Sequence, residues 1–345
     1  MRKSAVLLLA LIFCSCKSRQ LNVTHRTENK RGGSVAAAAG NPAGGSLAVG
    51  TSVVPGGGGK VLGNDNLPTL FPVRVEGKYG YIDKKGKLVI QPQFSGASRF
   101  SEGLAAVQMQ RAGRVGYIDE TGNLVIPLQF DLADPFSEGL AAIFKDRKWG
   151  FMDRTGQVVV APAFAAVARF TEGMAVVGIL SGSIAGYTYI NRKGEPQTDS
   201  TIRFEVAMPF GDGLAPVRSL GEKIRYVDQS LKTVIAPQFM AAGEFSEGMA
   251  PVQVRAPEGM RWGFIDKTGK MAIPAHYYEA LPFLEGLAGV KVPSGKWGFI
   301  NQKDKMIIIP KYDSVAPFDN GMAQVYVGEG LGYIDLHGKY VWEPK

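Results

Sequence analysis

A repeat of about 36 residues constrains this chain more than any other feature of its sequence. One aromatic position of a short motif recurs eight times with a mean spacing of 36 residues, at Tyr81, Tyr117, Phe151, Tyr189, Tyr226, Phe264, Phe299 and Tyr333. Internal repeats with periods of about 20–50 residues are typical of solenoids, propellers and arrays. The repeat runs from about Leu67 to Pro344, so we predict a single repeat domain over residues 67–345.

Each repeat is predicted to contain three short strands and therefore to be all-β. An apolar segment such as Leu104–Val107 precedes an alternating segment such as Lys148–Asp153, as expected for strands with one buried face. An Asp-x-x-Gly turn, as in Asp83–Gly86, leads to a β-branched third strand. A proline soon follows that strand in seven repeats, and we expect it to end the strand because proline lacks a ladder donor.

Two turn positions depart from this pattern. Leu231 and Asp304 stand where the other turns have glycine, in a position predicted to be left-handed. Leu231 is the costlier departure, by about 1 kcal/mol. Seven Glu-Gly or related pairs precede the first strand of a repeat, and we expect their acids to accept backbone donors: Glu102, Glu138, Glu172, Asp212, Glu247, Glu285 and Asn320.

The charge distribution argues against a nucleic-acid partner. The formal net charge is +8, but residues 1–66 hold eight Lys/Arg and two acids, whereas residues 67–345 hold 31 basic and 29 acidic side chains. A nearly balanced repeat domain lacks the basic footprint of a nucleic-acid binder.

The N-terminus resembles a bacterial lipoprotein signal peptide, residues 1–16. Arg2 and Lys3 precede the apolar run 5–13, which is too short to cross a bilayer. Ser15 precedes Cys16, which we expect to carry the lipid, with ordinary secretion as the alternative. Residues 17–66 are rich in Gly, Ala and Ser, and we predict a flexible tether.

The repeats themselves resemble those of the WG-repeat (KWG-repeat) family. Lys148-Trp149-Gly150 and Lys296-Trp297-Gly298 carry the motif intact, and Arg261-Trp262-Gly263 is close to it. The resemblance covers about residues 67–345. It implies a bacterial β-rich repeat domain used in interactions, and it brings no catalytic residues.

Eight such units favour a closed, β-propeller-like ring. An open solenoid needs polar caps, whereas both the first unit (Leu70–Val73) and the last (Tyr340–Trp342) are as apolar as the interior ones. The unit length and strand number fall in the propeller range. An open β-solenoid remains the alternative, because no blade mixes strands from the two ends of the domain.

The sequence shows no catalytic constellation. His25, His276 and His337 lie in different phases of the repeat or outside it, so we predict neither a metal site nor a cofactor, and we expect the chain not to be an enzyme. Trp149, Trp262 and Trp297 recur in one strand position, and core packing is the better interpretation of them than sugar binding.

The largest departures from the repeat predict a binding surface at about residues 195–225. A polar segment that includes Asp199 and Arg203 replaces the third strand of the fourth repeat, and Lys223-Ile224-Arg225 replaces the Trp-Gly step of the fifth. We therefore expect a monomeric, membrane-tethered, non-catalytic module that binds an envelope protein or glycan. The expected location is the periplasmic side of the outer membrane, with secretion or cell-surface exposure as alternatives. A glycan- or peptide-processing propeller and a purely structural lipoprotein are the other hypotheses.

Overall fold

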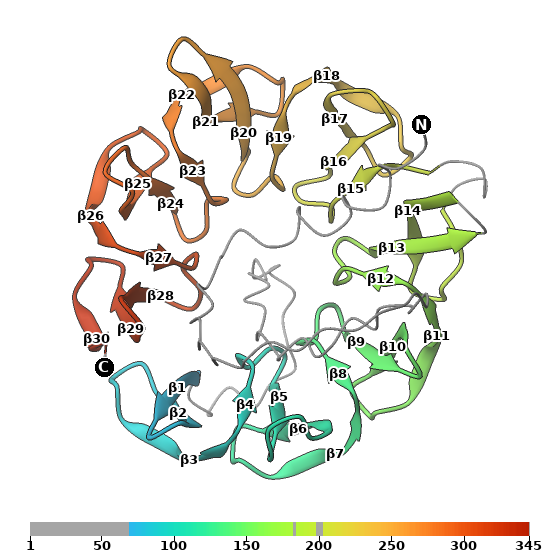
Figure 1. Cartoon of the computed structure of the whole chain (residues 1–345), viewed down its shortest axis with the longest axis vertical. Coiled ribbons are helices and arrows are strands. Elements are labelled where there is room, and N and C mark those ends of the chain that lie inside the picture. Colours follow the sequence, from blue (N-terminus) through green and yellow to red (C-terminus); the bar gives the residue numbers. More distant parts are fainter. Residues whose placement is uncertain (1–68, 182–183, 198–202, 345) are drawn as a thin grey trace, which may run out of the picture. The chain divides into compact units, whose positions relative to one another are not determined.

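The repeats form a closed ring of eight blades in the computed structural model (Figure 1). The structure describes residues 69–181, 184–197 and 203–344, which belong to one compact unit of the chain. The described residues fold into strands and turns, and no helix among them is long and apolar enough to cross a membrane. The predicted all-β propeller is confirmed, and the open solenoid is not adopted.

Each complete blade is a four-stranded antiparallel sheet whose strands follow one another from the centre of the ring outward. The innermost strands have two residues each: β4 (Gly96–Ala97), β8 (Leu132–Ala133), β12 (Ala166–Val167), β15 (Val206–Ala207), β19 (Ala241–Ala242), β23 (Glu279–Ala280) and β27 (Ser314–Val315). The next strands carry the apolar segment: β1 (Phe71–Val75), β5 (Leu104–Gln108), β9 (Leu140–Lys145), β13 (Met174–Ser181), β16 (Ala215–Arg218), β20 (Met249–Ala256), β24 (Leu287–Lys291) and β28 (Met322–Val327).

The two outer positions of each blade hold the aromatic motif and the β-branched segment. The third strands are β2 (Lys78–Ile82), β6 (Val115–Asp119), β10 (Lys148–Asp153), β14 (Ile184–Asn191), β17 (Ile224–Val227), β21 (Gly259–Asp266), β25 (Trp297–Asn301) and β29 (Gly330–Asp335). The outermost strands are β3 (Leu88–Phe94), β7 (Leu124–Phe130), β11 (Val158–Phe164), β18 (Thr233–Phe239), β22 (Met271–Tyr277), β26 (Met306–Tyr312) and β30 (Tyr340–Trp342). Blade 1 is β1–β3 and blade 4 is β12–β14, and the other blades have four strands.

The prediction that proline ends the third predicted strand holds only in the last repeat, where β30 ends at Trp342 before Pro344, and it is wrong in the other six. Pro92 lies inside β3, which continues to Phe94, and the same holds in β7, β11, β18, β22 and β26. The outermost strand has no neighbour on its outer side, so a missing N–H there costs no ladder bond. The register shifts between Tyr81↔Ile90 and Tyr79↔Phe94, which marks a bulge around the proline.

This bulge explains the glycine of the Trp-Gly step. A Cβ at Gly298 would lie 2.5 Å from the carbonyl oxygen of Ile308 and 2.9 Å from the nitrogen of Pro310. The same close approach occurs at Gly80, Gly116, Gly150 and Gly263. The glycine is therefore needed because the bulged outer strand rests directly on its backbone.

Neighbouring blades contact one another through the Asp-x-x-Gly turns. A Cβ at Gly269 would lie 2.8 Å from a methyl group of Ile235 on the preceding blade, and the turn glycines of blades 2, 3, 4 and 8 meet Ile90, Ile126, Val160 and Ile308 in the same way. As predicted, these glycines are left-handed, and the first aspartate of the turn accepts backbone N–H groups, as Asp83 does from Lys85 and Lys87 at 2.8 and 2.9 Å.

The acids of the Glu-Gly pairs tie each blade to the next. Glu102 lies in a turn of blade 2 and accepts, at 3.0 Å, the N–H of Gly139 in the corresponding turn of blade 3. Five further acids make the equivalent bond to the following blade: Glu138 to Gly173, Glu172 to Gly213, Asp212 to Gly248, Glu247 to Gly286 and Glu285 to Gly321. The predicted role as backbone acceptors is confirmed for these six acids, with the donor in the next repeat, whereas the side-chain amide of Asn320 donates to Asp319 instead.

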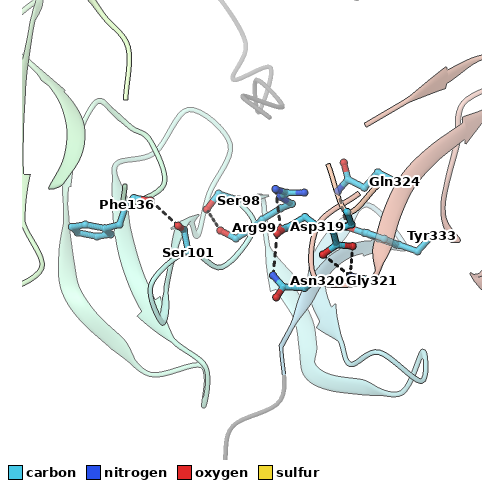
Figure 2. A network of polar contacts seen from close by, with 10 residues as sticks. Ser98, Arg99, Ser101, Phe136, Asp319, Asn320, Gly321, Gln324 and Tyr333 are labelled. Carbon is cyan, nitrogen blue, oxygen red and sulfur yellow. Dashed lines mark hydrogen bonds and ion pairs between the residues drawn. The ribbon is translucent and has the colours of Figure 1, made fainter. Parts of the chain in front are cut away.

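The ring closes between blades 8 and 1 without a shared sheet. The Tyr333 hydroxyl donates to the carbonyl oxygen of Pro72 at 2.8 Å, and its ring packs edge-on against Phe71 with centroids 5.5 Å apart. Arg99, between the two inner strands of blade 2, pairs at 3.0 Å with Asp319, between the two inner strands of blade 8 (Figure 2). These contacts join the ends of the ring in place of mixed strands.

We predict that Gly298→Ala destabilises the ring by about 1–3 kcal/mol, because the new methyl group overlaps a carbonyl oxygen that the bulge holds in place. The matched control is Gly96→Ala, whose methyl group would meet the side chain of Gln108 at 3.3 Å. Thermal or denaturant unfolding of the two variants measures the difference. Equal loss of stability in both would contradict the assigned role of the bulge.

Candidate functional site

The largest irregularity of the ring lies where the sequence predicts a binding surface, between blades 4 and 5. In the part of blade 4 that the structure describes, no regular strand pairs with the outer edge of β14. Two isolated bridges, Tyr187↔Phe204 and Ile190↔Pro196, mark where the outermost strand of other blades would run. Asp199 lies outside the described residues.

Leu231 compensates for this missing strand. It keeps the left-handed conformation of the turn glycines, with φ of 61°, and its side chain packs against a buried cluster that includes Tyr189, Phe204 and Phe210. In most other blades a turn glycine leaves room for an Ile or Val of the preceding blade. Here a leucine on the turn contacts the core of blade 4 instead, which explains the departure noted in the sequence.

Arg225 forms a cluster of contacts with Phe204, Ser219 and Glu222, and Arg203 directly precedes Phe204 in the sequence. The guanidinium carbon of Arg225 lies 5.8 Å from the centroid of that ring, and its Nη1 donates to Ser219 Oγ at 3.0 Å. Arg225 also pairs with Glu222 at 2.5 Å. Arg203, the neighbour of Phe204 in sequence, has a buried Nη1 without a hydrogen-bond partner.

Lys223 is not part of this cluster. It is exposed, and it makes no hydrogen bond or ion pair within the described residues. It belongs to residues 219–223, which connect β16 to β17 and which we name the blade 5 tip. Of the four predicted residues, Arg225 contacts the blade 5 tip, Lys223 is exposed on that tip, Arg203 lies beside Phe204 in the sequence, and Asp199 is not described.

The blade 5 tip stands between two longer hairpins. Strands β16 and β17 have four residues each, whereas β13 and β14 of blade 4 and β20 and β21 of blade 6 have eight each. At about 3.3 Å per residue the flanking hairpins extend further than the blade 5 tip. Leu220 at this tip is 87% exposed, more than any other large apolar side chain of the described residues.

Sequence reasoning missed Leu220. Its sequence context, Ser219-Leu220-Gly221, places an apolar residue in a polar turn, and this could have drawn attention to it. An isolated exposed leucine needs no explanation. Leu220 differs because it lies in the same tip as exposed Lys223 and next to Ser219, which Arg225 contacts, in the most irregular part of the ring.

Two carboxyl groups between the inner strands of their blades have raised pKa values. Burial raises the pKa of Asp134 from 3.8 to about 6. Burial also raises the pKa of Glu244, although its pairing with Arg169 at 2.5 Å acts in the opposite direction. Arg169 and Glu244 lie between the two inner strands of blades 4 and 6, so this pair bridges across blade 5. The pair Arg99–Asp319 bridges across blade 1 in the same way.

Other candidate residues have structural positions. His276 stacks on Tyr277 with centroids 4.1 Å apart, and its Nε2 lies 3.7 Å from Asp304. Trp149, Trp262, Trp297 and Trp342 pack in or against the apolar clusters of their blades, which fits the core interpretation. Among the described residues no group of three or more His, Cys, Asp or Glu side chains could hold a metal ion.

The repeats match the WG containing repeat model of protein families at residues 79–110, 116–149, 149–179, 224–255, 262–296 and 297–329. These segments cover more than half of the chain. The chain belongs to the WG-repeat family. The longest gap between matched segments of this WG-repeat protein falls in the fourth repeat, which carries the incomplete blade.

Among solved structures, the chain is similar to the computationally designed Ika8 protein at 14% identity, covering 72% of this chain and 85% of that one, with a TM-score of 0.49. It is similar to BamB from Moraxella catarrhalis at 12% identity (76% and 92% covered, TM-score 0.49) and to the WD40 β-propeller domain of Doa1 at 13% (72% and 98%, TM-score 0.40). With scores below 0.5, none of the three bears on function. No curated protein sequence matches the WG-repeat protein.

We predict that Asp134→Asn changes how stability depends on pH. Because the folded-state pKa of Asp134 is raised, the native state binds the proton more tightly, and this residue makes the protein less stable as the pH rises from about 4 to above 6. The variant should therefore gain about 1–3 kcal/mol at pH 7–8 relative to the wild type, and less at pH 4.

Denaturant unfolding at several pH values measures this difference. Asp146→Asn is the matched control, since Asp146 is exposed and asparagine tolerates its left-handed conformation. A pH-independent difference between wild type and Asp134→Asn would contradict the assignment.

Proposed function

We propose that this WG-repeat protein is a non-catalytic interaction module that binds a partner protein through the blade 5 tip and the adjoining Arg225. The observation that carries the proposal is the combination at that tip of highly exposed Leu220 with Lys223, which pairs with none of the described residues, between two longer hairpins. Exposed apolar contacts surrounded by charged side chains are typical of protein-binding sites.

The arrangement of Arg225 supports the same proposal. Its contacts with Phe204, Ser219 and Glu222 hold the guanidinium in one place, so little side-chain entropy is lost when a partner binds nearby. Arg225 also replaces the glycine of the Trp-Gly step that the bulge requires in most other blades. A residue that departs from such a requirement is a reasonable candidate for a binding role.

The proposal includes the expectations about the N-terminus, which lies outside the described residues. We propose that lipid on Cys16 anchors the protein, that residues 17–66 act as a tether, and that the ring works as a monomer on the periplasmic side of a bacterial outer membrane. A tethered module needs no cofactor and acts by holding its partner near the membrane.

We expect Leu220→Ala combined with Lys223→Ala to weaken binding of the partner at least about tenfold, because it removes an apolar contact and a free charge at the centre of the proposed surface. Affinity capture from envelope extracts of the source cell, with the full-length protein immobilised, identifies proteins retained stoichiometrically. Titration of the retained protein against wild type and variant then measures the loss.

The matched control is Leu124→Ala combined with Lys87→Ala. Leu124 is 50% exposed on β7, and Lys87 is exposed beside an Asp-x-x-Gly turn, so both changes lie away from the blade 5 tip. Equal binding by the blade 5 variant and the wild type, or retention of glycans alone, would contradict the proposal.

A further inference from the structure

A second surface lies at the tips of blades 2 and 3. The connection between β5 and β6 carries Arg111 and Arg114, and the connection between β9 and β10 lies within Lys145–Lys148. Four of these cations, Arg111, Lys145, Arg147 and Lys148, are exposed and make no hydrogen bond or ion pair within the described residues. We name Arg111, Arg114, Lys145, Arg147 and Lys148 the basic patch.

Two contacts join the two tips into one surface. Arg114 pairs with Asp131 at 2.7 Å, and the N–H of Asp131 donates to the carbonyl oxygen of Phe144 at 3.0 Å. Phe144 directly precedes Lys145, so the blade 2 tip lies beside the blade 3 tip. Blades 2 and 3 are also neighbours in the ring, and they are separated from blade 5 by blade 4 (Figure 1).

The backbone of the blade 3 tip indicates that the side chain of Arg147 matters. Asp146 and Arg147 are both left-handed, with φ of 52° and 62°. The equivalent tip of blade 1 is Glu76-Gly77, so Arg147 occupies a position where that hairpin has glycine. A side chain in this conformation is unfavourable. Keeping an arginine there needs a compensating role outside the fold.

We infer that the basic patch binds the anionic headgroups of a lipid bilayer. Its cations extend into solvent from two adjoining hairpin tips and surround no buried polar cradle, which suits a spread negative surface better than a single anion. Met109, at the blade 2 tip, is 41% exposed and can reach the headgroup region beside them. Each Lys or Arg held near an anionic bilayer strengthens partitioning about fivefold.

This inference goes beyond the proposed partner site and does not depend on it. Contact through blades 2 and 3 would hold the ring in one orientation at the membrane and leave the blade 5 tip free. An acidic protein segment is the alternative ligand for such a patch, and the test below separates the two.

The test uses the full chain with Cys14→Ser and Cys16→Ser, so that no variant is acylated and the N-terminus is the same throughout. Sedimentation with vesicles gives the ratio of binding to phosphatidylcholine containing 30% phosphatidylglycerol over binding to phosphatidylcholine alone. We expect Arg111→Gln, Lys145→Gln, Arg147→Gln and Lys148→Gln together to lower this ratio at least about tenfold at low salt.

The matched control replaces four exposed lysines of the turns before the outermost strands with glutamine: Lys84, Lys85, Lys267 and Lys303. It removes the same charge from other parts of the ring and should leave the ratio within about twofold. An unchanged ratio in the patch variant, or an equal fall in both variants, overturns the inference. The inference is also overturned if the patch variant keeps its lipid ratio but no longer binds poly-glutamate, because the patch then binds an acidic protein segment.

A single substitution separates binding from folding. Arg147→Gly restores the residue that blade 1 has at this position, so we expect equal or higher thermal stability together with a lipid ratio lowered about fivefold. An environment-sensitive dye on Met109→Cys, in the cysteine-free background, should shift on anionic vesicles, whereas the same dye on Lys85→Cys should not. A lowered melting temperature for Arg147→Gly with an unchanged lipid ratio would contradict the inference.

Discussion

The ring depends on the packing of each Asp-x-x-Gly turn against the blade before it. The turn glycine has no side chain, so a β-branched residue such as Ile235 can enter the space beside Gly269 and bury its methyl groups between two blades. Burial of this kind supplies the main stabilising free energy of repeat proteins, since one unit of about 36 residues cannot offset its own ordering entropy. The carboxylate of each Glu-Gly pair then fixes the spacing by accepting an N–H of the next blade.

These demands divide the polar residues of the protein into two groups. The acids of the Glu-Gly pairs and the aspartates of the turns bond backbone donors and hold the ring. The connections between the apolar strand and the aromatic-motif strand of each blade are not needed to hold the ring. They vary in length, charge and apolar content from repeat to repeat. The blade 5 tip and the basic patch both lie in these connections. Recognition is therefore assigned to the part of each repeat that the fold leaves unconstrained.

Much of this architecture could be predicted from one sequence because eight copies report the same physical requirement. The turn glycines, the recurring aromatic residues and the apolar ends at Leu70 and Trp342 pointed to a ring. Two features could not be read from the pattern. Proline marked a bulge inside the outer strand instead of its end, because an unpaired edge tolerates the missing donor. The partner of Glu102 lies 37 residues away in the next blade, and spacing alone does not show which turns meet. Leu220 lies in a connection that differs from repeat to repeat, so no repetition marked it, whereas Leu231 stood out because it replaces a recurring glycine.

The division between structural and free polar groups can be measured directly by amide hydrogen exchange of the free protein with residue-level resolution. The account predicts slow exchange at Gly139, Gly173, Gly213 and Gly286, whose N–H groups bond carboxylates of the preceding blade. It predicts fast exchange across residues 219–223 and 145–148 apart from the amides within the strand ladders. Exchange at the four glycines as fast as at these tips would show that the carboxylate contacts do not hold the ring, and would contradict the account.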